Sequence, residues 1–208
     1  MIRYTTGDEL FIKRIMAAPK VKQLLEMLYF YDEETYNHSI RVAYVAMYMC
    51  DRAKQENTPG ADKLDKKKIV TAAILHDIGK MFVPHQILHK KTYLTEEEFA
   101  VIKDHPHLGA ELARISSLPE SVCEMIENHH KKMDGSGYPK GKCLPSEGAM
   151  LVSVADMFSA ITEKRSYKER EDADTGVGFV YSEIENGRIP KSYGSLLESV
   201  VCEMMAVS

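Results

Sequence analysis

The sequence predicts an all-α domain of about eight or nine helices. Alternation of β-branched and polar residues, which is typical of a half-buried strand, is essentially absent from the chain. Apolar residues instead recur at helical spacing along most of the 208 residues. Glycine and proline concentrate around 58–60 and 134–148 rather than at strand-length intervals. Since a typical domain has about 150 residues, the length predicts one core with room for an extra element.

The N-terminal third shows where the first helices begin and end. Two short helices are expected with a break near residues 18–19, because proline cannot continue a helix. A long helix over 32–54 should end at the turn-forming run 57–60, which reads Asn-Thr-Pro-Gly. We therefore expect residues 1–30 to form a short N-terminal helical extension and residues 31–208 to form the main domain.

A capping box marks one of the later helices. Thr95 and Glu98 have the spacing at which each side chain caps the backbone of the other, which predicts a helix over 95–116. The remaining helices are expected over 64–78, 119–130, 146–164, 172–186 and 192–206.

Composition excludes several classes of protein. The net charge is −4, with 27 basic and 31 acidic residues, which argues against a general binder of polymeric nucleic acid. The longest uncharged run of the first half, 42–50, is too short to cross a membrane, and acidic residues interrupt the N-terminus where a signal peptide would be apolar. The four cysteines are scattered without a CxxC pair. We expect a cytoplasmic protein with reduced thiols and no membrane partner.

Histidines and one aspartate fall on apolar helix faces. His105 completes an apolar stripe of the expected helix 95–116, made of Phe99, Ile102, Leu108, Leu112 and Ile115. The same spacing places four more polar residues on core faces: His38, His76, His129 and Asp156. A single histidine of this kind is more often a hydrogen-bonded core residue than a ligand. Five of them in one small core need a shared compensating charge, so the pattern predicts a bound metal cluster.

Adjacent ligand types refine this hypothesis. His76-Asp77 and His129-His130 could each serve two neighbouring metals, and Asp77 is the natural bridge because a carboxylate has two oxygens. Glu34 lies one helical turn before His38. Glu34 could be a further metal ligand or a solvated acid at the start of the helix, and the spacing favours neither role. Imidazole and carboxylate without thiolate suit Fe, Mn, Co, Ni or Zn in a catalytic site. Three other histidines are expected at the surface: His85, His89 and His107.

A glycine-rich loop follows the histidine pair. Residues 131–141 contain three glycines, which allow close backbone approach, and Pro139, which stiffens the exit. A hairpin turn at Asp134-Gly135 is the alternative, but the flanks are rich in lysine and lack alternating apolar residues. A loop that faces a ligand fits these residues better.

Four segments together resemble one family. They are LHDIGK at 75–80, HPHLG at 105–109, HHKKMDGSGYP at 129–139 and VADMFSAITEKRSYK at 154–168. With His38, their order and spacing resemble the HD-GYP subgroup of the HD phosphohydrolase superfamily over roughly 31–206. The resemblance implies an HD-domain helical bundle with a glycine-rich GYP loop. It also implies a metal-dependent phosphodiesterase that hydrolyses cyclic di-GMP to the linear dinucleotide and on to GMP.

The resemblance also implies roles for individual residues. Eight positions match metal ligands, for two or three divalent ions that would be iron or manganese: Glu34, His38, His76, Asp77, His105, His129, His130 and Asp156. Asp77 and Lys80 match catalytic positions. Five match positions that contact the substrate: Lys80, Gly137, Tyr138, Arg165 and Lys168. Without the resemblance, the charged segment around Arg165 and Lys168 would be interpreted as a solvated face.

The sequence departs from the family pattern at several positions, and none of the departures removes a ligand. Lys90-Lys91-Thr92 stands where Lys-Pro-Gly is common, Lys131 where an acid is common, Ser159 where Asp is common, and Ser166 where Pro is common. Two other functions stay open. One is hydrolysis of another cyclic or linear nucleotide, and the other is a catalytically silent receptor. The GYP loop could also bind a signalling protein partner.

Overall fold

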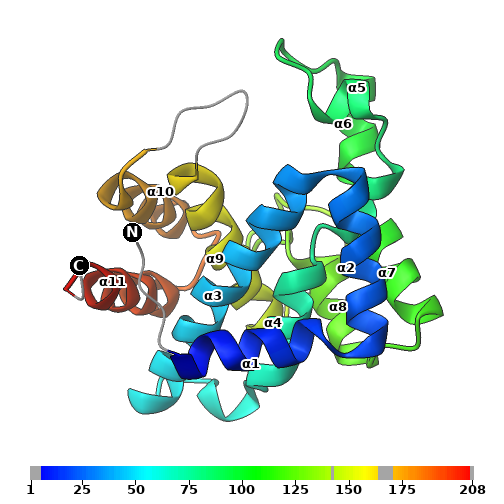
Figure 1. Ribbon diagram of the computed structural model, residues 1–208. Coiled ribbons are helices and arrows are strands. Elements are labelled where there is room, and N and C mark those ends of the chain that lie inside the picture. The colour runs from blue at the N-terminus through cyan, green and yellow to red at the C-terminus, as the bar shows by residue number, and fades with distance from the viewer. Residues whose placement is uncertain (1–5, 142, 164–170, 207–208) are drawn as a thin grey trace.

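The computed structural model describes residues 6–141, 143–163 and 171–206, and the regular secondary structure of these residues is all helical, as predicted (Figure 1). Two short 3₁₀ segments, η1 and η2, interrupt the α-helices. In chain order the elements are α1 (Thr6–Met16), α2 (Pro19–Tyr31), α3 (Glu33–Gln55), η1 (Ala61–Lys63), α4 (Lys66–Leu75), η2 (Ile78–Phe82), α5 (His85–Leu88), α6 (Glu96–Lys103), α7 (His105–Ile115), α8 (Glu120–Asn128), α9 (Glu147–Thr162), α10 (Ala173–Glu185) and α11 (Lys191–Ala206).

Helix α3 runs through the middle of the bundle (Figure 1). It packs most extensively against α4 and α9, and it also contacts α2 and α11. Helices α7 and α8 pack together on one side, while α10 and α11 lie beside α9 on the other (Figure 1). Helices α5 and α6 project beyond the bundle. This arrangement surrounds α3, α4, α8 and α9 with neighbours, so side chains from these four helices can meet in the interior.

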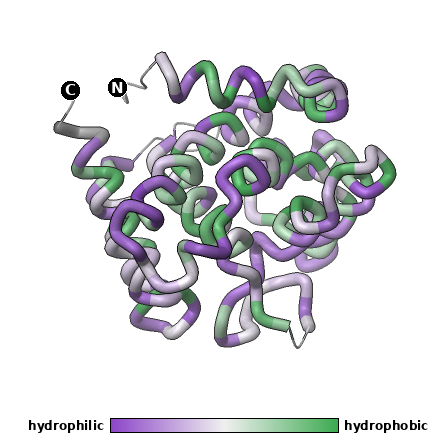
Figure 2. The backbone as a smooth tube through the Cα atoms, turned by 90° about the horizontal axis from the view of Figure 1, so that it is seen from below, coloured by the Kyte–Doolittle hydropathy of each residue, from purple (hydrophilic) through white to green (hydrophobic). Residues whose placement is uncertain are grey.

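The buried faces follow from the composition of each helix. Hydrophobic and hydrophilic residues alternate along most helices, as expected when one face is buried (Figure 2). Two stretches are buried on all sides, Ile69–Leu75 in α4 and Ala149–Asp156 in α9. Residues of α1 and α2 such as Ile12 and Leu28 belong to the same hydrophobic core. The N-terminal helices therefore pack on the bundle, and the division at residue 31 stays a prediction.

Local signals place several helix ends correctly. Helix α1 ends at Met16 and α2 begins at Pro19, as the expected break requires. The capping box at the start of α6 is present in both directions between Thr95 and Glu98. Asp32 caps α3 by accepting a hydrogen bond from the backbone N–H of Thr35 at 3.1 Å.

The prediction of one helix over 95–116 is wrong. Helices α6 and α7 are separated at Asp104, because Pro106 has no N–H to donate and is tolerated only in the first turn of a helix. Part of the predicted apolar stripe is also not buried, because the chain changes direction there. Phe99 and Ile115 are 43% and 79% exposed. His105, by contrast, is buried at the start of α7. The predicted helix 64–78 likewise ends early, at Leu75, and continues as η2 after a turn.

Gly79 allows η2 to lie directly against α7. A Cβ atom at this position would lie 1.9 Å from the backbone oxygen of His105 and 2.6 Å from the backbone nitrogen of Gly109. Backbone atoms cannot move aside as a flexible side chain can. The absence of a side chain at Gly79 therefore permits the turn after α4 to lie close to His105.

We expect Gly79→Ala to lower the free energy of unfolding by about 3 kcal/mol, because the added methyl group must separate two packed backbone segments. Gly178→Ala in α10 is the matched control, since a Cβ there meets nothing within 4 Å. The control should be stabilised by about 0.5–1 kcal/mol through helix propensity. Urea unfolding of both variants measures the difference, and equal stability of Gly79→Ala and wild type would contradict the packing argument.

Candidate metal centre

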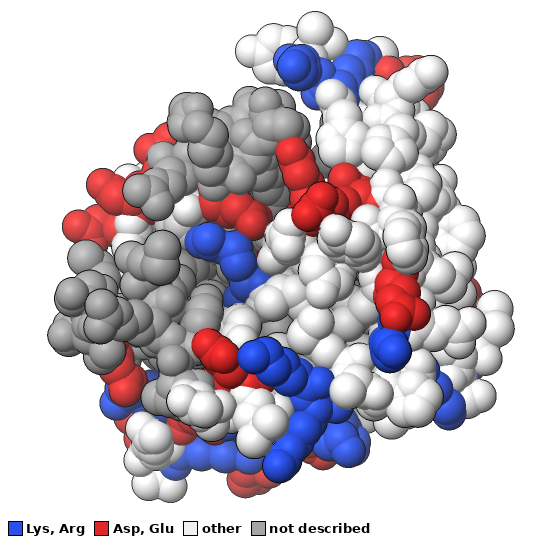
Figure 3. Space-filling model, in the orientation of Figure 1, with Lys and Arg blue, Asp and Glu red and all other residues white. Residues whose placement is uncertain are grey.

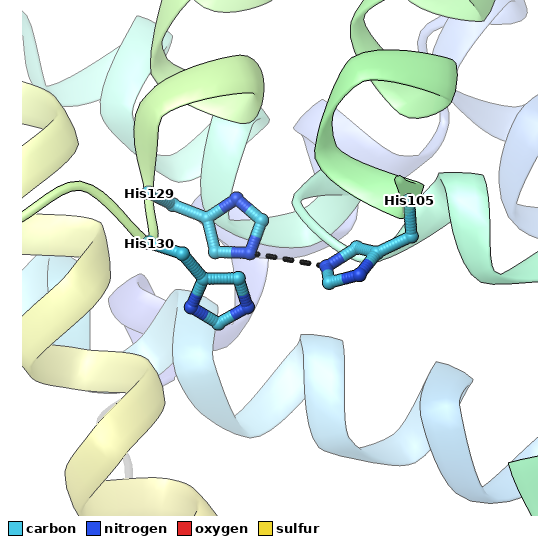
Figure 4. Close-up of side chains that lie close together, drawn as sticks. All are labelled: His105, His129 and His130. Atoms are coloured by element: carbon cyan, nitrogen blue, oxygen red, sulfur yellow. Dashed lines mark hydrogen bonds between the residues drawn. The ribbon is translucent and has the colours of Figure 1, made fainter. Parts of the chain in front are cut away.

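Side chains from five helices or helix ends meet in the interior of the bundle. Three groups each bring three possible ligand atoms within 4.8 Å of one another: His38, His76 and Asp77; His76, His129 and Asp156; His105, His129 and His130. Figure 4 shows the last group, with the imidazole rings facing one another from the ends of α7 and α8. The structure thus brings together seven of the eight residues predicted as ligands, and their binding of metal stays a prediction.

Asp77 lies at the centre of this cluster. Its Oδ1 is 3.1 Å from Nε2 of His105, and its Oδ2 is 3.2 Å from Nε2 of His76. Lys80, one turn of η2 later, donates a hydrogen bond of 2.7 Å to the same Oδ2. The Asp77 side chain is 2% exposed. Its two carboxylate oxygens therefore face different histidines, which is the geometry expected of a bridging ligand.

Asp156 forms the second acidic contact of the cluster. Its Oδ1 lies 2.9 Å from Nε2 of His38 and 3.8 Å from Nε2 of His76. Its Oδ2 lies 4.0 Å from Nδ1 of His130. Helix α9 thus supplies one carboxylate opposite the one that follows α4.

Three of the histidines are held in the same way. The Nδ1 atoms of His76, His105 and His129 lie 2.8, 2.7 and 2.6 Å from the backbone oxygens of Ala73, Ile102 and Ile126, three residues earlier. These oxygens belong to the last turns of α4, α6 and α8, where helix carbonyls lack a partner further along the helix. A carbonyl only accepts, so each Nδ1 carries a proton, and in the neutral ring each Nε2 presents a lone pair. The lone pairs of all three rings are therefore available to the centre.

This arrangement fits a bound cation. The Nε2 atoms of His105 and His129 lie 3.4 Å apart, on the dashed line of Figure 4, although with both protons on Nδ1 neither atom can donate to the other. Nε2 of His76 and Oδ1 of Asp77 are buried without a hydrogen-bond partner among the described residues. Electron-rich atoms gathered in this way repel one another unless a positive charge lies among them. The donor set of imidazole and carboxylate is that of a catalytic transition-metal site.

The electrostatics of the cluster favour the deprotonated ligands that metals require. Burial, reinforced by the neighbouring histidines His130, His76 and His105, holds the pKa of His129 well below its usual range. Burial lowers the pKa of His130 to about 3. Burial raises the pKa of Asp77, but the positive charges of His76 and Lys80 outweigh it and keep this pKa well below the usual range. At neutral pH His129 and His130 are therefore neutral imidazoles beside ionised carboxylates. Burial lowers the pKa of His76, but the carboxylate of Asp77 outweighs it and raises this pKa above its usual value.

The glycine-rich loop closes over the histidine pair. The Tyr138 ring packs on the ring of His130 with a centroid distance of 4.6 Å. Backbone contact is equally close, because a Cβ at Gly137 would lie 2.1 Å from the backbone oxygen of His130. No strand flanks the loop within the described residues, so the hairpin alternative at Asp134-Gly135 is wrong. The loop forms one wall of the centre instead.

A pocket of about 380 Å³ opens beside the cluster. Asp77, Lys80, His38 and Glu34 line it together with residues that follow α5. Glu34 belongs to none of the three ligand groups found among the described residues, but it faces the same space. A small anionic ligand could therefore reach Asp77 and Lys80 from solvent.

The sequence of these elements matches one family model, the HD domain, over residues 35–161. The chain belongs to the HD domain family. The resemblance noted from the sequence motifs is thereby confirmed at the level of this superfamily. The His76-Asp77 pair lies within the matched region, at the centre of the cluster.

Curated relatives of this HD domain are named phosphodiesterases. A cyclic di-GMP phosphodiesterase of Thermotoga maritima is 35% identical over 169 residues, covering 78% of this chain and 44% of the relative. The cyclic di-GMP phosphodiesterase response regulator RpfG of Xanthomonas campestris is 37% identical, covering 66% and 38%. The 3'3'-cGAMP-specific phosphodiesterase 1 of Vibrio cholerae is 30% identical, covering 74% and 35%. The chain spans less than half the length of each of these relatives.

Solved structures share the fold of this HD domain. The HD domain of the Listeria monocytogenes phosphodiesterase PgpH, in complex with cyclic di-AMP, superposes with a TM-score of 0.65 at 19% identity, over 89% of this chain and 94% of that one. Bd1817, an HD-GYP-type protein of Bdellovibrio bacteriovorus, superposes with a TM-score of 0.63 at 18% identity, over 93% and 62%. The predicted HD-domain helical bundle is confirmed.

Two of the predicted substrate-binding residues are not described by the structure. Arg165 and Lys168 lie outside the described residues, so their predicted contacts stay predictions.

Charges of both signs lie side by side on the face shown in Figure 3, which is not the continuous basic surface of a nucleic-acid binder. No helix among the described residues has the length and apolar composition that a membrane span requires.

Two contacts of the HD domain were not predicted. His89, expected at the surface, is 30% exposed and pairs with Asp32 at 3.1 Å beside the pocket. His85 and His107 are exposed as expected. Glu163, at the end of α9, lies 2.9 Å from Nδ1 of His38. The seven-residue spacing from Asp156 would place Glu163 on the same face of the helix predicted over 146–164. In the structure α9 ends at Thr162, and Glu163 is the extended cap residue that follows it.

Proposed function

We propose that this HD domain is a metal-dependent phosphodiesterase that hydrolyses cyclic di-GMP to the linear dinucleotide and then to GMP. The observation that carries the proposal is the set of three histidines that direct Nε2 lone pairs at one another and at Asp77. The names of the curated relatives support the substrate class. We also propose that this activity is cytoplasmic, as expected from the sequence.

The proposed ligands are the seven clustered residues together with Glu34, for two or three ions of iron or manganese. Divalent ions bound there supply Lewis acidity toward phosphate oxygens and lower the pKa of water toward neutrality. Asp77 and Asp156 hold the negative charge that such ions require, and the Nδ1–carbonyl bonds keep three imidazoles in the correct tautomer.

The remaining residues act on the substrate. Lys80 keeps an ammonium group at the pocket, 2.7 Å from Asp77, where it offsets the negative charge that develops on a reacting phosphate. Gly137 lets the loop approach His130, and Tyr138 presents a ring to the ligand from the same wall. Arg165 and Lys168 are proposed to bind phosphate or a guanine edge. A signalling protein partner would meet the exposed part of the loop, residues 133–136.

The deciding experiment combines metal analysis with product chromatography. The purified protein, supplied with iron or manganese, should hold two or three ions per chain and convert cyclic di-GMP into GMP through the linear dinucleotide. Parallel incubations with cyclic di-AMP and 3'3'-cGAMP measure which dinucleotide is preferred. Binding of cyclic di-GMP without turnover by the metal-loaded protein would favour the receptor function, and one ion or none would contradict the proposed centre.

Glu34→Ala tests whether the pocket holds a third ion. We expect the variant to slow cleavage of the linear dinucleotide more than cleavage of cyclic di-GMP, because a terminal phosphate carries more charge than a diester and gains more from an additional cation. The linear product should therefore accumulate in time-resolved chromatography. Glu33→Ala is the matched control, since Glu33 is an exposed acid in the same first turn of α3. Equal slowing of both steps by Glu34→Ala would reduce Glu34 to a structural role.

A further inference from the structure

Glu163 lies behind His38, on the side of the imidazole ring away from the metal centre. Its Oε2 is 2.9 Å from Nδ1 of His38, while Nε2 of the same ring is 2.9 Å from Oδ1 of Asp156 and 4.0 Å from Oδ2 of Asp77. The side chains of His38 and Glu163 are 2% and 12% exposed. One ring nitrogen therefore faces Glu163, and the other faces the two carboxylates of the centre.

His38 differs from the other histidines of the cluster in its place along a helix. His76 and His129 follow the last residues of α4 and α8, and His105 follows the end of α6, so a carbonyl without a helical partner lies within reach of each Nδ1. His38 stands inside α3, where the carbonyl oxygens of the preceding turn already accept backbone N–H groups. The Nδ1 of His38 instead meets an acceptor from another part of the chain, the carboxylate of Glu163.

We propose that Glu163 is the positioning residue of His38. It accepts the Nδ1 proton and so holds Nε2 toward Asp156 and Asp77, as backbone carbonyls do for the other three rings. The inference rests on the proposed metal centre, and it adds a residue that is not itself a ligand. An acceptor with a full negative charge also makes the ring a stronger donor toward a cation than a neutral carbonyl does.

The carboxylate of Glu163 is itself held in place. Glu163 is the cap residue directly after α9, and its backbone N–H donates to the carbonyl oxygen of Ser159 in the last turn of that helix. Asp156 within α9 and Glu163 at its end therefore meet the two sides of the His38 ring. Nε of Arg41 lies 3.9 Å from Oε1, the oxygen that His38 does not use. Arg41 follows His38 by three residues on α3, so the two contacts tie the end of α9 to one face of α3.

The test measures metal binding rather than turnover. Metal-free wild type, Glu163→Ala and Glu163→Gln are titrated with Zn²⁺ by calorimetry, and Glu185→Ala, an exposed acid at the end of α10, serves as the control. We expect Glu163→Ala to bind roughly 10- to 100-fold more weakly at unchanged stoichiometry. Glu163→Gln should recover part of the affinity, because its amide oxygen can still accept the Nδ1 proton. Thermal unfolding of the metal-free proteins checks that each variant folds.

Nuclear magnetic resonance of the zinc-loaded protein provides a second readout. In wild type and Glu163→Gln, the Nδ1 proton of His38 should exchange slowly with solvent, and in Glu163→Ala it should exchange fast. Equal zinc affinity and equal exchange in Glu163→Ala and Glu185→Ala would overturn the inference while leaving the metal centre intact. Loss of a whole equivalent of zinc in Glu163→Ala would also overturn it, because Glu163 would then be a ligand. Failure of the wild type to bind zinc would instead contradict the proposed centre.

Discussion

Asp77→Ala should lower the turnover of cyclic di-GMP by roughly 10³-fold or more and should also reduce the metal content of the protein. Asp77 contacts His76, His105 and Lys80 through its two buried oxygens. Its removal takes away the charge that faces both sides of the centre, so the imidazole lone pairs and any bound cations lose their shared acidic partner. Elemental analysis and product chromatography on the same sample measure both effects.

Two further variants separate charge from shape at this position. Asp77→Asn keeps the size of the side chain and removes its charge, so it should resemble Asp77→Ala in activity. Asp62→Ala, at an exposed acid of η1, should leave turnover and metal content at wild-type values. An active Asp77→Ala protein with full metal content would show that Asp77 does not bridge.

Lys80→Ala should have the second largest effect, with a different signature. We expect the metal content and the fold to be retained and the maximal rate to fall by roughly 10²- to 10³-fold, the usual loss when one electrostatic stabiliser is removed. Lys80 reaches the pocket with a side chain that is 16% exposed, and it contacts the centre through Asp77. Its charge is therefore available to a phosphate group in the pocket.

Saturating substrate is required for this measurement, so that the loss of rate is not confused with weaker binding. Lys80→Arg should retain part of the rate because it keeps the positive charge. Lys67→Ala, at an exposed lysine of α4, controls for the change in net charge. Unchanged maximal turnover in Lys80→Ala would rule out its catalytic role.

The sequence predicted the elements whose signals are local. Proline at position 19 and the Thr95–Glu98 box act on the backbone within one turn, so the start of α2 and the start of α6 follow from neighbouring residues alone. The helix over 95–116 was wrong because Pro106 can either start a helix or interrupt one, and periodicity does not distinguish these cases. The exposure of Phe99 and Ile115 depends on which elements cover them, and that is decided by packing.

The membership of the candidate metal centre was also predicted from the sequence. A histidine on an apolar helix face must enter the core, and this argument applies to His38, His76, His105 and His129 without knowledge of the neighbours of each. The motifs added His130, which follows α8 and was not on an apolar helix face. Glu34 and the segment with Arg165 and Lys168 still rest on the motifs.

By itself, then, the sequence determined an all-α fold and the histidines and aspartates that enter its core, and it predicted the ligand chemistry of the candidate centre, because helix periodicity and residue chemistry are local properties. Only the tertiary structure decided which ring nitrogens face the centre and which acids they meet. His38 lies 118 positions from Asp156 and 125 from Glu163, so their contacts depend on how α3 and α9 pack. Close packing of the two helices is a property of the whole core, and no periodicity within either segment specifies it.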